Sequence, residues 1–216
     1  PLIEKMETQL AALDWDHGFE TALRIVNLEL TNISALRVKG ALLVVRDNNL
    51  KLAGTVLKQL IASTERVEMG NNELLLQICQ LFARICGGSS EILDITLRCL
   101  EKLAKLNPLQ PIFLTELGYQ RLMLGDGNLE LAAQYFRSAT KMQENCYEAL
   151  CGLSLCQLRQ PNGKDKEQVL QQLEFLTELQ EHLPDAMLFY LKSLASENSE
   201  ESVSELENLL PFLRYL

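Results

Sequence analysis

Apolar residues recur along this chain at helical spacing, in segments separated by short polar breaks. The clearest segment places leucines three or four residues apart, at Leu93, Leu97, Leu100, Leu103 and Leu106. Each segment has roughly 12 to 17 residues, a common length for a helix in a globular protein. The strict alternation of apolar and polar residues that is typical of a half-buried strand is nowhere sustained. We therefore predict an all-α fold.

The breaks are rich in Gly, Asn, Asp and Pro, residues that end helices and form turns. They fall at residues 47–49, 70–72, 87–90, 107–108, 125–128, 144–145, 161–163, 184 and 197–199. Side chains that accept hydrogen bonds from the first turn of a helix stand at the end of several breaks. The predicted N-caps are Asn49, Ser90, Asn128, Asp165 and Asn198.

The helices are predicted to come in pairs, because one short pattern recurs at a nearly constant interval. Its anchor leucines lie 39, 39, 36 and 38 residues apart, at Leu36, Leu75, Leu114, Leu150 and Leu188. A small residue follows four positions after each of the first four anchors, at Gly40, Cys79, Gly118 and Ser154, whereas Lys192 follows the fifth. A small residue at this position lets a second helix cross closely.

The second helix of each pair carries a packing pattern of its own. In the third pair it consists of Ala132, Phe136 and Ala139, spaced four and three residues apart. The same spacing recurs at Ala53, Leu57 and Leu60, and again at Val169, Leu173 and Leu176. The first helices offer a matching set in Phe19, Leu23 and Val26. The repetition favours stacked helix hairpins.

The break Leu124 to Asn128 reads LGDGN and raises the question of a ligand loop. A phosphate loop needs Lys-Ser or Lys-Thr after its glycines, and a calcium loop needs alternating acidic residues and a final Glu. Neither pattern is present. We predict a turn in which Gly125 and Gly127 adopt positive φ and Asn128 caps the next helix.

The third pair resembles a tetratricopeptide repeat, which stacks hairpins of a helix A and a helix B. The matching residues are Leu114, Leu117 and Gly118 in helix A, and Ala132, Phe136 and Ala139 in helix B. Arg121 and Glu144 replace an aromatic residue and a proline of the family pattern. The resemblance implies a single right-handed superhelical solenoid. Its approximate hairpins are 1–31 (partial), 32–70, 71–109, 110–145, 146–183 and 184–216.

A closer resemblance runs from about Asn32 to Leu194, through FLTELGYQ, EALCGLSLCQL and QQLEFLTELQ. These segments are similar to the tetratricopeptide repeat protein 21 family, the large solenoid subunit of intraflagellar transport complex A. The resemblance implies a non-catalytic scaffold for retrograde ciliary transport and membrane-protein delivery to cilia. It implies protein partners within that complex, and a location in the cytoplasm and the cilium, at the axoneme or the ciliary base.

The family geometry also implies a concave groove lined by the A helices. Its candidate partner-facing residues are Arg37, Gln80, Thr115 and Tyr119. A groove that clamps an acidic chaperone tail needs Lys and Asn on successive A helices, and that set is missing. A free-standing adaptor that binds a short peptide in the groove is the alternative to a scaffold.

Charge and termini refine the expected partners. The net charge of the chain is −9, and the stretch from residue 165 to residue 207 accounts for all of it, because it contains eleven acidic residues and two basic ones. An acidic end would repel nucleic-acid phosphates, so nucleic acid is not an expected partner. No apolar run reaches the roughly 18 residues of a membrane span, so direct membrane insertion is not expected. Because the chain lacks an initiator Met and has apolar ends, we expect a fragment whose ends pack on more solenoid or on a partner.

The candidate chemistry is sparse. Cys79 and Cys86 lie seven residues apart on one helical face and could form a redox pair or a metal clasp, but small, reduced core residues are the favoured interpretation. Reduced cysteines indicate the cytosol. His17 and His182 lie in different repeats, and we find no Ser/His/Asp or Cys/His set. We therefore expect that the protein is not an enzyme and that it binds no metal, no cofactor and no small-molecule substrate.

Overall fold

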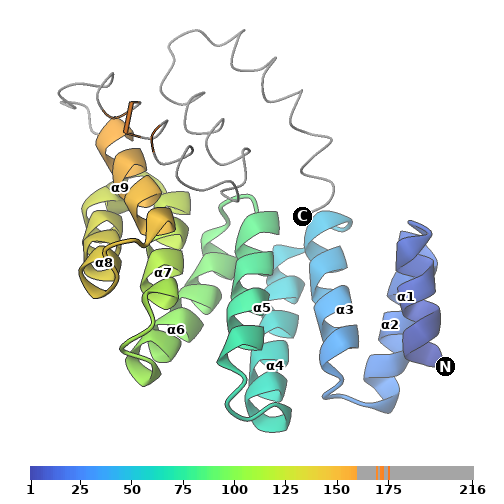
Figure 1. The fold of residues 1–216 in the computed structure, drawn as a ribbon. Coiled ribbons are helices and arrows are strands. Elements are labelled where there is room, and N and C mark those ends of the chain that lie inside the picture. Colours follow the sequence, from blue (N-terminus) through green and yellow to red (C-terminus); the bar gives the residue numbers. More distant parts are fainter. Residues whose placement is uncertain (160–168, 170, 173–174, 176–216) are drawn as a thin grey trace, which may run out of the picture. The chain divides into compact units, whose positions relative to one another are not determined.

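The computed structural model describes residues 1–159, 169, 171–172 and 175, and within them every regular element is a helix (Figure 1). The prediction of an all-α fold is confirmed. The chain divides into two compact units, Pro1–Pro108 and Leu109–Leu216. The first unit contains α1 (Leu2–Ala11), α2 (Trp15–Leu28), α3 (Ile33–Val45), α4 (Leu50–Val67), α5 (Asn72–Ile85) and α6 (Ser90–Leu106). The second contains α7 (Pro111–Met123), a 3-10 turn η1 (Asp126–Asn128), α8 (Leu129–Met142) and α9 (Tyr147–Arg159).

Each unit is built by stacking helix hairpins. In the first unit α1 packs on α2, α3 on α4 and α5 on α6, and the pairs are joined by contacts of α2 with α3 and of α4 with α6. In the second unit α8 packs on both α7 and α9, and α7 also reaches α9. A hairpin therefore buries one apolar face inside itself and another against its neighbour.

The predicted breaks between residues 47 and 145 are confirmed as the connections from α3 to α9. Two further connections precede these. Ala12–Asp14 was not predicted, because Asp14 is its only turn-favouring residue, whereas Glu29–Asn32 lies at the expected boundary between the hairpins 1–31 and 32–70. At the first of them Leu13 turns the chain with a positive φ of 59°, a conformation that is uncommon outside glycine. Composition alone therefore conceals that residues 2–28 form two helices.

The side chains that cap the helices only partly match the prediction. Asn49 caps α4 as expected, because its side chain accepts a hydrogen bond from the backbone N–H of Leu52. The prediction of Ser90 is wrong by one residue, since Ser90 lies inside α6, and Asn128 precedes α8 without a side-chain bond. Three caps were missed, at Asp14, Asn32 and Asn71. The predicted caps Asp165 and Asn198 lie outside the described residues.

The LGDGN segment forms the turn between α7 and α8, as predicted. Gly125 has a φ of 104°, which a residue with a side chain rarely adopts. The predicted positive φ of Gly127 is wrong, because Gly127 lies in the 3-10 turn η1, whose backbone has negative φ. A methyl group added to Gly127 would meet no atom within 4 Å.

The packing triplets of the second helices are confirmed in α4 and α8. All six side chains are fully buried: Ala53, Leu57, Leu60, Ala132, Phe136 and Ala139. In α2 the prediction is shifted, because Ala22, Ile25 and Val26 are buried whereas Phe19 and Leu23 are half-buried. Val169 is buried, and the other two members of its predicted triplet lie outside the described residues.

The small residues of the A helices make room for aromatic rings. A Cβ added to Gly118 in α7 would lie 2.6 Å from the ring of Phe136 in the paired helix α8. A Cβ added to Gly40 in α3 would lie 2.7 Å from Phe82, which belongs to α5, the first helix of the following hairpin. The small residue thus admits a partner helix in one case and a neighbouring hairpin in the other.

Several sequence predictions lie outside the described residues. They are the anchor Leu188, the exception Lys192, the second histidine His182, the hairpin 184–216 and nearly all of the acidic stretch 165–207. The division into six hairpins over residues 1–216 remains a prediction. No helix in the described part of the chain combines the length and apolar character required to cross a bilayer.

Candidate interaction surfaces

The four predicted groove residues divide between the two units. Arg37 is exposed on α3 and Gln80 is half-buried on α5, both in the first unit. Thr115 and Tyr119 lie one turn apart on α7, in the second unit. The structure therefore brings Thr115 and Tyr119 together on one helix face.

That face of α7 contacts the start of α9. The Thr115 hydroxyl donates to the backbone carbonyl of Pro111 at 3.1 Å and lies 3.6 Å from the thiol of Cys146, the residue before α9. The Tyr119 hydroxyl donates to the backbone carbonyl of Glu148 in α9 at 2.6 Å. Burial, followed by the nearby Cys151 and Glu148, holds the pKa of Tyr119 well above its ordinary value, so the phenol stays a donor.

Tyr119 also supports the aromatic core of the second unit. Its ring packs edge-on against Phe136, with ring centroids 5.0 Å apart and an angle of 69° between the planes. This is the arrangement that the aromatic quadrupole favours. Thr115 and Tyr119 thus hold successive first helices together, and their contact with a partner stays a prediction.

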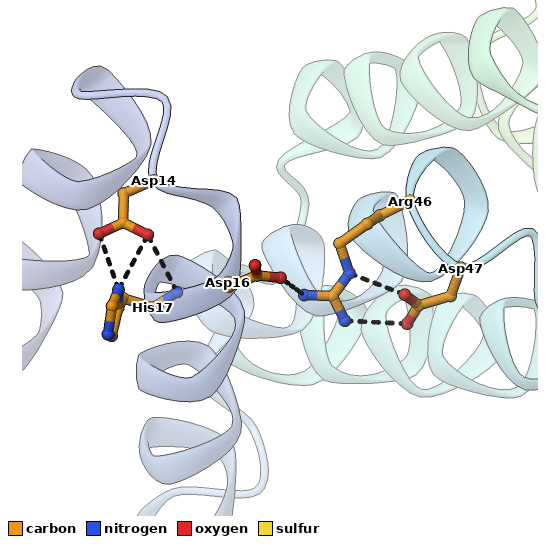
Figure 2. Close-up of polar contacts among 5 residues, drawn as sticks. All are labelled: Asp14, Asp16, His17, Arg46 and Asp47. Atoms are coloured by element: carbon orange, nitrogen blue, oxygen red, sulfur yellow. Dashed lines mark hydrogen bonds and ion pairs between the residues drawn. The ribbon is translucent and has the colours of Figure 1, made fainter.

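A polar cluster of the first unit links α2 to the end of α3 (Figure 2). The guanidinium of Arg46 donates to both carboxylate oxygens of Asp47, at 2.7 and 3.1 Å, and to the carboxylate of Asp16 at 3.0 Å. The same guanidinium lies 4.2 Å from the ring centroid of Phe19, a cation–π contact. Arg46 therefore joins the first hairpin to the second.

The charges of this cluster reinforce one another. The Arg46 guanidinium lowers the pKa of Asp47, mainly through their hydrogen bond. The two carboxylates in turn raise the pKa of Arg46, with Asp47 making the largest contribution. Sequence reasoning missed this cluster because Asp16 and Arg46 are thirty residues apart and belong to no short motif.

Asp14 and His17 form a second polar pair at the start of α2 (Figure 2). The Asp14 carboxylate caps the helix by accepting from the backbone N–H of His17 at 3.3 Å, and it accepts from His17 Nδ1 at 2.8 Å. The hydrogen bond with Asp14 raises the pKa of His17 above 6.5, and it lowers the pKa of Asp14 below 3.8.

We expect the backbone amides at the start of α2 to become less protected from hydrogen exchange as pH rises above 6.5. The folded state holds the His17 proton more tightly than the unfolded chain, so this stabilisation is complete below pH 6.5 and disappears as pH rises through the raised pKa. Amide hydrogen exchange of α2 measured across this range should show the change. His17→Gln should remove the pH dependence and keep the Asp14 cap, and an unchanged profile in that variant would contradict the assignment. The Asp14 contribution is lost only below pH 3.8.

All six cysteines are free and buried. The favoured interpretation of Cys79 and Cys86 as reduced core residues is confirmed. Cys86 donates to the carbonyl of Ala83, and Cys79 is hydrogen-bonded to Cys99 across α5 and α6. The bond with Cys79, helped by Lys102, lowers the pKa of Cys99 below 9.0. Burial instead raises the pKa values of Cys151 and Cys156 to about 11.

Cys99 should therefore react faster with iodoacetamide than Cys151 or Cys156 in the folded protein. Because the pKa of Cys99 is lowered and the pKa values of Cys151 and Cys156 are raised, Cys99 has the larger thiolate population near neutral pH. We expect its alkylation to be at least about tenfold faster, although a low-pKa thiolate is the weaker nucleophile. Mass spectrometry of timed samples measures each rate. Cys79→Ala should slow the alkylation of Cys99, because it removes the hydrogen-bond donor. Cys79→Ser keeps a donor and should leave the rate unchanged. Equal rates in both variants would contradict the role of the hydrogen bond.

The described residues line clefts on both units, and two of them are apolar enough to note. One of about 590 Å³ runs between the starts of α1 and α3 and the end of α2, lined by Leu2, Ile3, Ile25 and Leu28 with Glu4 and Glu29. The other, of about 300 Å³, lies beside α9 and is lined by Leu150, Leu153, Ser154, Gln157, Gln172 and Phe175. Among the described residues, no group of three or more His, Cys, Asp and Glu side chains is arranged to hold a metal ion.

Comparisons with known proteins identify relatives over nearly the whole chain. A model of the tetratricopeptide repeat protein 21 second ARM domain matches residues 55–213. Human tetratricopeptide repeat protein 21B is 35% identical over 209 residues, which are 96% of this chain and 16% of that protein. Mouse tetratricopeptide repeat protein 21A is 30% identical over 210 residues, 97% of this chain and 16% of that protein. The chain thus spans about one sixth of the length of these relatives.

Solved structures share the fold at low sequence identity. MamA AMB-1 has a TM-score of 0.54 and 13% identity, and the match covers 83% of this chain and 99% of that chain. YrrB, a TPR protein with an unusual peptide-binding site, has a TM-score of 0.50 and 16% identity, with coverage of 89% and 91%. Both support an all-α tetratricopeptide-like solenoid.

Proposed function

Because this chain belongs to the tetratricopeptide repeat protein 21 family, we propose that it is a scaffold segment of intraflagellar transport complex A. In this role it contributes to retrograde transport along the ciliary axoneme and to delivery of membrane proteins to cilia. Its partners are other protein subunits of that complex, and its location is the cytoplasm and the cilium. The match of the family model to residues 55–213 carries the proposal.

The arrangement of the described helices supports a scaffold. Side chains of the A helices contact neighbouring helices of the stack. Tyr119, for example, donates to a carbonyl of α9 and packs its ring against Phe136 of α8. Arg46 similarly joins two hairpins through Asp16 and Phe19. Side chains used in this way stiffen a solenoid, which presents its outer surfaces to other proteins.

We propose that the segment is non-catalytic. His17 is held by the Asp14 carboxylate at an exposed helix start, and among the described residues no nucleophile is hydrogen-bonded to its ring. Cys151 and Cys156 have pKa values of about 11, so neither thiol is ionised near neutral pH. These three described side chains therefore do not supply the activated nucleophile that covalent catalysis requires.

The groove-binding adaptor is less well supported. Thr115 and Tyr119, two of its four proposed contacts, direct their hydroxyl groups to Pro111 and Glu148 within the second unit. A peptide in this groove would compete with those bonds. An adaptor should be a monodisperse monomer whose peptide affinity falls on Tyr119→Ala, and sedimentation with a binding titration would detect it.

The scaffold proposal is tested in the full-length protein. In ciliated cells, tagged full-length protein and a version lacking this 216-residue segment should be purified, and the co-purifying subunits of the complex quantified. We expect the deletion to lose at least one subunit and to slow retrograde transport. A matched control carries an unrelated tetratricopeptide solenoid of equal length in place of the segment, and it should show the same losses because it restores only the length. A deletion that retains every subunit and normal transport would refute the proposal.

A further inference from the structure

The turns that follow α2, α4 and α6 share one sequence pattern. Leu28-Glu29-Leu30 and Val67-Glu68-Met69 each place a carboxylate between two large apolar residues, and they lie 39 residues apart. A further 39 residues along the chain, Leu106-Asn107 ends α6. The 39-residue period of the hairpins thus also holds for exposed residues outside the buried core.

The backbone of the three turns is also similar. The middle residues Glu29, Glu68 and Asn107 have φ of −140°, −109° and −127°, with positive ψ. In each, the backbone N–H donates to the carbonyl four residues earlier, at Ile25, Thr64 and Leu103 respectively. The same local geometry therefore presents an apolar side chain before the middle residue in all three turns, and a second one after it in the first two.

Hydrogen bonds hold these turns in place. Gln59 Nε2 of α4 donates to the backbone carbonyl of Leu30 at 2.8 Å, which fixes the first turn on the second hairpin. Asn71 accepts from the backbone N–H of Leu74 at 3.1 Å and closes the second turn. Asn72 Nδ2 donates to Asn107 Oδ1 at 3.1 Å and joins the start of α5 to the third turn. A surface anchored in this way loses little conformational entropy on binding.

The apolar side chains of these turns are solvent-exposed. Leu28 is 78% exposed and Met69 84%, and we define the turn edge as Leu28, Leu30, Val67, Met69 and Leu106. Alternate turns of antiparallel helices lie at opposite ends, so the turn edge follows one side of the first unit, at the lower ends of α2, α4 and α6 in Figure 1. An aligned series of exposed apolar residues marks an interaction site more strongly than scattered ones do.

The charges within the turn edge are acidic. Glu29 and Glu68 stand between the apolar pairs, and both side chains are exposed. Arg66 and Lys105 lie one residue before the edge, in the last turns of α4 and α6, where a positive charge offsets the helix dipole. A partner that covers these apolar residues therefore also contacts the carboxylates of Glu29 and Glu68, which lie between them.

We propose that the turn edge of the first unit binds an amphipathic helix of a partner protein, with apolar residues at heptad spacing and Lys or Arg beside them. The helices α4 and α6 pack on each other, and packed helices lie about 8–10 Å apart, whereas seven residues of a helix rise about 10.5 Å, so apolar residues one heptad apart match the turns after α4 and α6. The first turn lies beside α4, because the Leu30 carbonyl accepts from Gln59. The basic residues pair with Glu29 and Glu68. This inference rests on the proposed scaffold function and names the chemistry of one partner.

Two other occupants fit the turn edge less well. An extended strand covers about 10 Å in three residues, and its side chains at that spacing point to opposite faces. A second copy of this chain, related by a two-fold axis through the central turn, would bring Glu68 against the same carboxylate, which is repulsive. A basic amphipathic helix avoids both problems.

The test uses this chain and a synthetic 21-residue helical peptide with one leucine per heptad and lysines at the adjoining positions. Fluorescence anisotropy measures the Kd of the labelled peptide. We expect Leu28→Gln/Met69→Gln to raise Kd about tenfold or more. Glu29→Gln/Glu68→Gln should weaken binding and reduce its salt dependence.

Matched controls make the result decisive. Leu13→Gln/Val45→Gln alters two residues with exposures of 67% and 66% on the turns after α1 and α3, at the opposite ends of the helices, and should leave Kd unchanged. A peptide with glutamate in place of lysine should bind at least about tenfold more weakly. Circular dichroism and thermal melting confirm that each variant is folded.

The proposal is overturned if the lysine peptide does not bind, if the glutamate peptide binds equally well, or if the control variant loses as much affinity as the edge variant. Sedimentation that shows a dimer lost on Leu28→Gln/Met69→Gln would assign the turn edge to a second copy and also overturn it. These outcomes are independent of the subunit recovery from ciliated cells, so failure here leaves the scaffold proposal standing, and failure there leaves the peptide measurement valid.

Discussion

Phe136→Ala is expected to lower the free energy of unfolding of the second unit by about 3–5 kcal/mol, the range for removing a fully buried aromatic side chain. The Phe136 ring fills the space left by two glycines. A Cβ on Gly118 would lie 2.6 Å from it, and a Cβ on Gly152 of α9 would lie 2.3 Å from it. Tyr119 packs against the same ring. Its removal leaves a cavity among three helices, and helix backbones held apart by other contacts cannot collapse to fill it.

Urea unfolding followed by circular dichroism measures this loss. Tyr135→Ala is the matched control, because Tyr135 precedes Phe136 on α8 and is only half-buried. We expect its effect to be less than half as large, since less apolar area is lost from the core. Gly152→Ala should also destabilise the protein, and Phe136→Leu in the same chain should recover part of that loss. Additive effects of these two substitutions would show that the ring and the glycine do not interact as described.

Gly40→Leu is expected to destabilise the first unit by about 2–3 kcal/mol through overpacking. A Cβ at this position would lie 2.7 and 3.0 Å from two ring atoms of Phe82 and 3.4 Å from Val56, and leucine adds three further carbons. Phe82 is fully buried, so its ring has no open space to move into. The hairpins α3–α4 and α5–α6 must therefore separate or distort.

A double substitution identifies the cause of this loss. Phe82→Ala by itself removes a core ring and should cost about 3–5 kcal/mol. Combined with Gly40→Leu, the leucine occupies part of the vacated space, so the pair should cost clearly less than the sum of the two singles. Gly54→Ala is the control, because its added methyl group meets the mobile end of Ile95 at 3.3 Å and helical alanine is favoured over glycine by up to about 1 kcal/mol. If Gly40→Leu is as mild as Gly54→Ala, the close approach of Phe82 is refuted.

Periodicity was enough to predict the helices from α3 to α9, the pairing within the hairpins α3–α4, α5–α6 and α7–α8, and most of the core. Side chains spaced by three or four residues share a helix face whatever surrounds them, so Ala132, Phe136 and Ala139 could be placed in the core from the sequence alone. The turns rich in glycine and asparagine were also correct, because those residues favour turn conformations locally. Where a turn lacks them, as at Leu13, the local signal is missing and the break was overlooked.

The groove residues illustrate the limit of this reasoning. Thr115 and Tyr119 were selected for their position on α7, yet a position on a helix does not reveal which neighbour its hydroxyl reaches. The bond of Tyr119 to the Glu148 carbonyl spans two helices and 29 residues. The turn edge was likewise not anticipated, since exposure of Leu28 and Met69 becomes visible only when the stack is assembled.

The class of fold, the hairpin period and the family could be predicted from residue order, because all three are recorded in the spacing of residue types along one helix or one repeat. Three contacts became visible only in the folded protein: the hydrogen bond of Cys79 with Cys99, the link that Arg46 makes between Asp16 and Asp47, and the close approach of Phe82 to Gly40 of another hairpin. These contacts join residues distant in the chain, and their partners depend on how the helices cross and how far each side chain extends. Local spacing carries no information on either quantity.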